Sequence, residues 1–397
     1  MKKFELKNYL RIIFLCPLAL LTACESTGQS SSLTSSQSHD LPVTAESSAS
    51  EDNLSKSEAK KLGYVVVTDY IEPNSGKDIS KQLQTIIDSN PRRTIYFPDG
   101  YYIIDSPLVT PAHHQKCVDI RMSNYAVIKA GLNWDKSNTA MIRLGGKDPE
   151  NNIAVAGTNY SISGGVLDGN GIANGISIES GRETQIHDLS IKNTVIGIHI
   201  LHGANSGSSD ADIHNVNIYG NGKAEAKGVV IEGYDNTLTN MRIGNVRIGI
   251  EVHSGGNVLR NIHPLFIAGP YASSYGFYDS SRNRNWYDYC YSDQFRYGYY
   301  LESGCSAVIS NGFTFWYANW GDQTAVYAAG NFASLINEIS VGFNGDGHSR
   351  AILETSGSGG CGVIENILAD KNTITDNTYE NYLTGKVIGE KTTADFI

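Results

Sequence analysis

Four ionisable side chains in the middle of the chain have the composition of an acid–base site. Glu232, Glu251, His253 and Glu302 each lie in or just after a short apolar segment. Glycoside hydrolysis needs paired carboxylates, because one protonates the leaving oxygen while the other activates water or attacks the sugar. Like charges held close together separate their pKa values and create that division of roles. A histidine beside them could instead remove the proton next to a uronic acid, as a lyase requires.

The same residues also fit a solvated charged face whose side chains pair with one another. For Arg242 and His263, too, both a functional and a purely structural interpretation are open. A guanidinium binds a carboxylate bidentately, which would suit recognition of an acidic sugar, and the alternative is an ordinary surface pair.

Aromatic density is the third chemical signal. Eleven of the 23 tyrosines lie between Tyr271 and Tyr327. Tyr278, Tyr300 and Tyr327 are expected to bind substrate, because flat amphipathic rings bury apolar area against a sugar face. Trp286 would add a wall to the same groove. Stacked tyrosines can equally stabilise a β-structure that binds no ligand.

A repeat places these residues relative to one another. A short pattern, apolar–variable–polar–apolar, recurs once per 21 to 28 residues, and a second alternation follows a glycine, as in Gly249-Ile250-Glu251-Val252. Alternation with period two indicates strands, and repeats of this length indicate a solenoid. We therefore predict an all-β fold, a right-handed single-stranded parallel β-helix, in which equivalent residues of successive coils lie about 4.8 Å apart.

The predicted register defines the exposed columns. On the strand after the repeat glycine, the first outward column is Ser177, His199, Val230, Glu251, Tyr278, Tyr300 and Tyr327. The second outward column is Glu179, Leu201, Glu232, His253, Ser280 and Glu302. The four acid–base residues then fall within about 15 Å of one another. A different face carries Ser190, Asn217, Arg242, His263 and Cys290.

The polar position of the repeat is expected to be structural. It runs through Gly164, Asp188, Asn215, Asn240, Asn261, Asp288, Asn311, Glu338 and Asn366. Inward amides at a bend can hydrogen-bond along the stack. The remaining cysteines show no metal-ligand spacing, no metal site is expected, and buried thiols are the favoured interpretation.

Four segments are predicted along the chain. Residues 1–24 match a lipoprotein signal, with basic residues, an apolar run and Leu21-Thr22-Ala23-Cys24, so Cys24 is expected to carry the lipid. Residues 25–60 form a Ser/Thr-rich disordered tether. Residues 61–375 form the β-helix, opened by a capping helix that begins near Asp78, and residues 376–397 form a polar tail. The protein is expected in a bacterial cell envelope, attached to a membrane.

Charge limits the partners. The net charge of −10 argues against nucleic acid. No cofactor is expected, and calcium would enter only by bridging a polyuronate substrate. A homo-oligomer is left open.

The capping helix, Phe97-Pro98-Asp99-Gly100-Tyr101-Tyr102 and Gly164-Gly165-Val166-Leu167-Asp168-Gly169-Asn170-Gly171 resemble the pectate-lyase-like superfamily. Within it, they resemble most the group with rhamnogalacturonase, epimerase-like proteins and phage tailspikes. The resemblance implies the fold over residues 64–370 but not a reaction. The Asp-Asp and Gly-His-Gly signatures of polygalacturonase and the aspartate and arginine set of calcium-dependent pectate lyases are absent.

We therefore expect a lipoprotein that cleaves or modifies a polysaccharide in a groove, as a glycoside hydrolase or a polysaccharide lyase. The alternative is a non-catalytic glycan-binding or adhesin-like protein.

Overall fold

The chain forms the predicted all-β, right-handed parallel β-helix. The computed structural model describes residues 57–369, apart from segments 136–139, 149–160, 203–207, 267–272, 317–322, 329–333, 344–348 and 355–362. The predicted signal with Cys24, the tether up to residue 56 and the tail 376–397 lie outside the described residues. No helix among the described residues is long and apolar enough to span a membrane.

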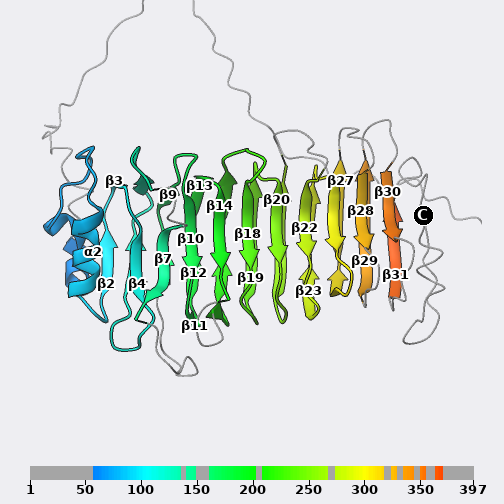
Figure 1. Ribbon diagram of the computed structural model, residues 1–397, viewed down its shortest axis with the longest axis horizontal. Helices are drawn as coiled ribbons and strands as arrows, with labels where there is room; N and C mark the ends of the chain where they lie inside the picture. Colours follow the sequence, from blue (N-terminus) through cyan, green and yellow to red (C-terminus); the bar gives the residue numbers. More distant parts are fainter. Residues whose placement is uncertain are drawn as a thin grey trace, which may run out of the picture. The chain divides into compact units, whose positions relative to one another are not determined.

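Each complete coil contributes strands to three stacks, and Figure 1 shows successive coils side by side from α2 to β31. One stack is a ten-stranded parallel sheet: β4 (Leu108–Pro111), β7 (Ala140–Lys147), β10 (Asn174–Ile178), β14 (Ile196–Ile200), β18 (Lys227–Ile231), β20 (Ile248–Val252), β22 (Tyr275–Asp279), β25 (Tyr297–Leu301), β28 (Gln323–Ala328) and β30 (Ser349–Glu354).

The other two stacks join in a 19-stranded sheet, because some strands run through both. The first stack holds β1 (Val65–Val66), β2 (Thr94–Phe97), β5 (Asp119–Met122), β8 (Ser161–Ser163), β12 (Gln185–His187), β16 (Asp212–His214), β23 (Arg284–Asp288) and β26 (Ser306–Ser310). The second holds β3 (Gly100–Ile104), β6 (Ala126–Ala130), β9 (Val166–Asp168), β13 (Ser190–Thr194), β17 (Asn217–Gly220), β24 (Tyr291–Asp293) and β27 (Gly312–Trp316). The shared strands are β19 (Thr237–Gly244), β21 (Val258–Leu265), β29 (Leu335–Phe343) and β31 (Val363–Ala369). A separate pair joins β11 (Gly181–Arg182) to β15 (Ser208–Ser209).

The repeat glycine is required by close packing inside the coils. A Cβ atom on Gly228 would lie 2.4 Å from the carbonyl oxygen of Gly249 in the next coil and 2.5 Å from a methyl group of Ile243. Real Cβ atoms do not approach so closely, so only glycine fits, and this explains the glycine that precedes the alternating segment. The inward residues of that segment, such as Val229 and Ile231, are fully buried.

The bend between the first and second stacks differs from the prediction in two ways. Its residues have left-handed backbone, with φ of 55° at Asn215 and 54° at Asn240, and their side chains are exposed rather than inward. Asn240 still donates to Asn215 (3.4 Å), so the amides form a ladder on the outside. Two coils after Asn240, the bend residue is Tyr289 (φ 52°) rather than the predicted Asp288. The register pairs Asp288 with Arg260, so Asp288 lies one position before the bend.

The inward amides lie at another corner of the coil, between the ten-stranded sheet and the first stack. Asn236, Asn257 and Asn285 are fully buried. The Asn236 amide donates to Asn257 Oδ1 (2.9 Å), and the Asn257 amide donates to Asn285 Oδ1 (3.0 Å). The ladder satisfies polar groups that the turn would otherwise bury unpaired.

The first coil is closed by the predicted helix, α2 (Ser80–Ser89), which follows the 3₁₀ turn η1 (Val67–Asp69). Asp78 accepts a hydrogen bond from the backbone N–H of Ser80 (2.9 Å), which supports the helix start. Leu83, Ile86 and Ile87 are buried in the same core as the coils. Cys290 and Cys305 are buried thiols, as expected, whereas Cys117 is only partly buried and Cys361 lies outside the described residues.

Candidate functional site

The two outward columns predicted for the repeat lie on the outer face of the ten-stranded sheet. The register pairs Val230 with Glu251, Glu251 with Tyr278, and Tyr278 with Tyr300. Tyr300 in turn pairs with Tyr327. Side chains from four coils therefore share one face, as the repeat predicted, but Val230 and Glu251 are buried among their neighbours rather than exposed.

Glu251 and His253 lie at the centre of this surface, on and just after β20. They are two residues apart on an extended strand, so both side chains leave the same face. His253 Nε2 lies 3.0 Å from Glu251 Oε1, and His253 Nδ1 lies 2.7 Å from Ser280 Oγ of the next coil. Lys227, from the preceding coil, forms an ion pair with the other Glu251 oxygen. We call Lys227, Glu251, His253 and Ser280 the central cluster.

The charges in the central cluster are set by its neighbours. Burial alone would raise the pKa of Glu251, but the hydrogen bonds from His253 and Lys227 outweigh burial and hold that pKa below its ordinary value. The bond to Glu251 raises the pKa of His253, against the opposing effect of burial. The cluster therefore holds an ionised carboxylate beside an imidazole that favours its protonated form.

The other two carboxylates have their own partners. Glu232 Oε2 lies 3.4 Å from His199 Nε2 on the preceding coil. Glu302 accepts a hydrogen bond from the Tyr278 hydroxyl (2.8 Å). Each of the three predicted carboxylates thus pairs with a basic or hydroxyl group of the described chain. Crowding of the carboxylates was expected to raise one of their pKa values. The pKa of Glu251 is lowered instead, because Lys227 and His253 contact its carboxylate.

The tyrosines form a stack whose faces cover one another. The rings of Tyr278 and Tyr300 are stacked with centroids 5.5 Å apart, and those of Tyr300 and Tyr327 with centroids 4.5 Å apart. Tyr275 and Tyr297 form a parallel stack beside them, with centroids 5.4 Å apart. We call these five residues the tyrosine column. Because the ring faces cover one another within the column, the column presents ring edges and hydroxyl groups to solvent. The sequence had predicted that flat ring faces would contact the sugar.

Three of the predicted binding residues lie elsewhere. Arg242 and His263 pair in register on the second stack, as predicted, and line a groove of about 360 Å³ on the 19-stranded sheet. Trp286 is exposed on β23, in the first stack. None of the three belongs to the ten-stranded sheet that carries Glu251 and the tyrosine column. Arg242 and His263 lie on a different face, as predicted, whereas Trp286 does not add the predicted wall to the groove beside the tyrosines.

The residue beside His263 is Tyr291, not Cys290. The two rings are stacked with centroids 4.0 Å apart, and Cys290 is buried. This is the same one-residue shift that places Tyr289 at the bend, and it turns Cys290 inward because strand side chains alternate.

Sequence reasoning missed Lys227. It occupies the position just before the repeat glycine, where neighbouring coils carry Ile196, Ile248 and Tyr275 in register. That position forms a third column beside the two predicted ones. Lys227 is the single charged residue among these four aligned residues, which is the signal that could have identified it. Its contact with Glu251 depends on a side chain that reaches across to the next coil.

Comparisons with known proteins bear on the fold. No family model matches the chain, and no curated protein sequence matches it. The tailspike protein of E. coli bacteriophage HK620, in complex with a pentasaccharide, is similar in structure, with a TM-score of 0.54 and 14% identity over 80% of this chain and 68% of the tailspike. A mutant of that tailspike with a hexasaccharide gives 0.54 and 14%, over 80% and 67%.

A further match is the ORF18 protein of Geobacillus virus E2, with a TM-score of 0.46 and 13% identity over 80% of this chain. The chain spans 63% of the length of that protein. At such identities the likeness is one of architecture. The chain shares the parallel β-helix of phage tailspikes.

Proposed function

We propose that the outer face of the ten-stranded sheet binds a polysaccharide and hydrolyses it. The observation that carries the proposal is the contact between Glu251 and His253, 3.0 Å, beside the tyrosine column. An ionised carboxylate that keeps an imidazole protonated supplies a proton donor at neutral pH. Hydroxyl groups at the edge of the tyrosine column would bind the hydroxyls of a sugar chain.

Each member of the site has a distinct role in this proposal. His253 protonates the leaving oxygen with its Nδ1 proton; this atom lies 2.7 Å from the Ser280 hydroxyl, which a substrate oxygen would replace. Glu232 lies next to His253 in the second outward column and activates the attacking water. Glu251 and Lys227 position His253 and set its charge. Glu302 holds the Tyr278 hydroxyl.

The structural neighbours support carbohydrate as the ligand class. The solved HK620 tailspikes with this architecture hold a pentasaccharide or a hexasaccharide. We further propose that the protein is an envelope lipoprotein attached through Cys24, which would place the β-helix next to polysaccharides outside the cytoplasm. Metabolic labelling with a radioactive fatty acid tests the anchor: Cys24→Ser should abolish the label.

The test of hydrolysis is a polysaccharide panel with two readouts, new reducing ends and the ultraviolet absorbance of unsaturated uronate ends. Hydrolysis gives reducing ends without absorbance. His253→Ala and Glu232→Gln should each lower kcat by about 100-fold or more while leaving binding intact. Glu179→Gln is the matched control, since Glu179 lies in the same column but pairs with Arg143 (2.6 Å), away from the central cluster.

Other outcomes separate the rival functions. Reducing ends together with absorbance would identify a lyase and overturn hydrolysis. A non-catalytic glycan-binding protein is the second candidate, favoured by the pairing of every carboxylate in the predicted set. It would retain one immobilised glycan, release no products, and lose nothing in His253→Ala.

A further inference from the structure

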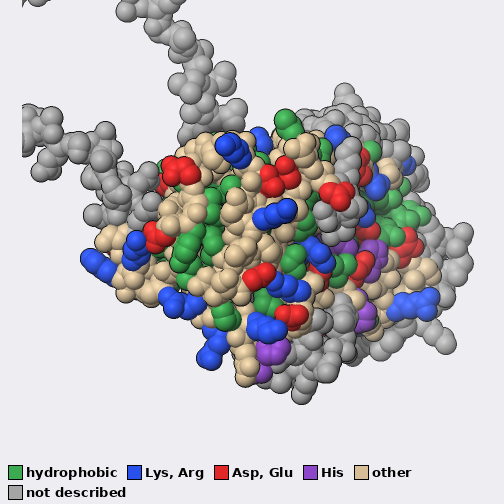
Figure 2. All heavy atoms as spheres, turned by 60° about the vertical axis from the view of Figure 1, so that its left-hand side comes forward, with side chains coloured by type: hydrophobic (Ala, Val, Ile, Leu, Met, Phe, Trp, Pro, Cys, Tyr) green, Lys and Arg blue, Asp and Glu red, His purple; other side chains and the backbone are tan. Residues whose placement is uncertain are grey.

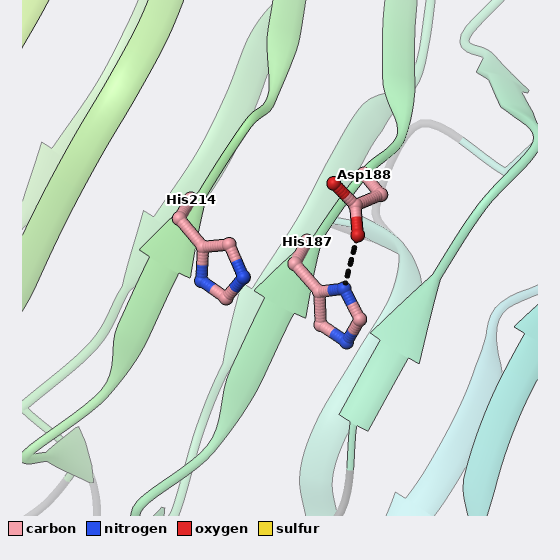
Figure 3. A group of neighbouring side chains, drawn as sticks. All are labelled: His187, Asp188 and His214. Atoms are coloured by element: carbon pink, nitrogen blue, oxygen red, sulfur yellow. Dashed lines mark hydrogen bonds and ion pairs between the residues drawn. The ribbon is translucent and has the colours of Figure 1, made fainter.

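A second cluster of chemically reactive side chains lies on the first stack of the 19-stranded sheet, away from the ten-stranded sheet. His187 of β12 and His214 of β16 pair in register on neighbouring coils. Their rings are parallel to within 6°, with centroids 5.0 Å apart. Figure 3 shows the two imidazoles side by side, with Asp188 next to His187.

The bend brings the carboxylate to the same side as the imidazoles. Consecutive residues of a strand point to opposite faces, so Asp188 would normally point away from His187. Its left-handed backbone (φ 55°) breaks that alternation, and Asp188 Oδ2 lies 2.9 Å from His187 Nδ1. Asn215 fixes the other oxygen by donating a hydrogen bond to Oδ1 (3.0 Å).

The combination is confined to one place in the repeat. Among the bend residues from Gly164 to Asn311, Asp188 is the single carboxylate, and the positions in register with the two histidines are Ser163 and Thr239. Asp212 lies 3.4 Å from His214 Nδ1, an outer carboxylate that would orient that imidazole as carboxylates orient metal-bound histidines.

We propose that His187, Asp188 and His214 bind one divalent transition-metal ion of the zinc class. One ligand atom from each residue lies within 4.8 Å of the others. Tetrahedral zinc with ligands at about 2.0–2.2 Å separates them by roughly 3.4 Å, so the side chains must close by about 1.5 Å at most. The two histidine side chains are 27% and 32% exposed, which leaves them room to rotate. The fourth position would face solvent. The ion would clamp two neighbouring coils.

The experiment is titration of the full chain with Zn²⁺ by calorimetry, and with Co²⁺ by visible absorption, which reports coordination number. We expect one ion per chain. His187→Ala and His214→Ala should each weaken binding by about tenfold or more. Asp188→Asn should also weaken it while preserving the bend, since asparagine holds that position in neighbouring coils.

The matched control is His113→Ala. His113 and His114 form another stacked pair, with centroids 5.0 Å apart, but no further His, Cys, Asp or Glu of the described residues completes a cluster with them. Its removal should leave zinc affinity unchanged. Binding that survives in both His187→Ala and His214→Ala, with circular dichroism showing an intact fold, overturns the site. So does the absence of any binding to the unaltered chain at millimolar zinc.

Discussion

At the scale of single residues, the contact between Glu251 and His253 makes stability depend on pH from both sides. The pKa of Glu251 is below its ordinary 4.5, so its stabilisation is present above pH 4.5 and is lost as pH falls through the lowered value. The pKa of His253 is above its ordinary 6.5, so its stabilisation is complete below pH 6.5 and is lost as pH rises through the raised value.

We therefore predict that the stability gap between the unaltered protein and Glu251→Gln is widest between pH 4.5 and 6.5 and narrows at alkaline pH. The measurement is the urea midpoint at a series of pH values. Glu302→Gln is the control, because its partner is the Tyr278 hydroxyl, whose pKa is raised by burial and by Glu302, so that the pair does not change charge near neutrality. An equal gap at all pH values would contradict a protonated His253.

At this scale, the sequence predicted the positions of side chains better than their charges and their bonding partners. The alternation after each glycine placed Glu251, His253 and Tyr278 correctly, because a strand leaves its side chains only two faces. Lys227 was missed, and with it the sign of the pKa change of Glu251. Which of several nearby charges a carboxylate meets depends on long side chains that reach across coils, and a column of residue types does not contain that information.

At the scale of elements, the two amide ladders should differ sharply in their contribution to stability. Asn257→Leu removes the acceptor of the buried Asn236 backbone N–H (3.1 Å). It also removes one of the two hydrogen bonds made by the Asn236 amide and one of the two accepted by the Asn285 oxygen, and it should cost about 2–5 kcal/mol. Asn240→Gly removes an exposed ladder side chain while keeping the left-handed bend, and should cost about 1 kcal/mol or less. Chemical denaturation compares the two, and equal losses would contradict the assignment of the inward ladder.

The bend also shows why one coil was predicted with a shifted register. Asn and Asp tolerate left-handed backbone, so the pattern favoured Asp288 as the bend residue. The structure uses Tyr289 there, an uncommon choice, and the following residues shift by one. Cys290 therefore turns inward and Tyr291 stacks on His263. The inward ladder was missed for a related reason: a polar column marks a corner, but not whether its side chains point in or out.

At the scale of the whole β-helix, charge and architecture set different limits. Figure 2 shows lysine and arginine side chains interspersed with aspartate and glutamate on the face displayed. The absence of a nucleic-acid partner stays a prediction, and it rests on the net charge of −10. The period of the repeat was enough to predict the solenoid, since each coil must bury its apolar face against the next.

The coils contact chiefly their neighbours, so damage at one end should stay there. Leu83 of α2 is 1% exposed and packs into the core of the first coils. Leu83→Ala should lower the opening free energy of amides in β2 and β5 by about 2–5 kcal/mol, while β20 and β22, which carry Glu251 and Tyr278, keep theirs. Native-state hydrogen exchange measures both, with the exposed Lys81→Ala as control. If the opening free energy fell equally in all strands, the β-helix would unfold as one cooperative unit, and the central cluster would depend on the integrity of α2. If it fell only in β2 and β5, the coils that carry the central cluster would maintain its geometry by themselves.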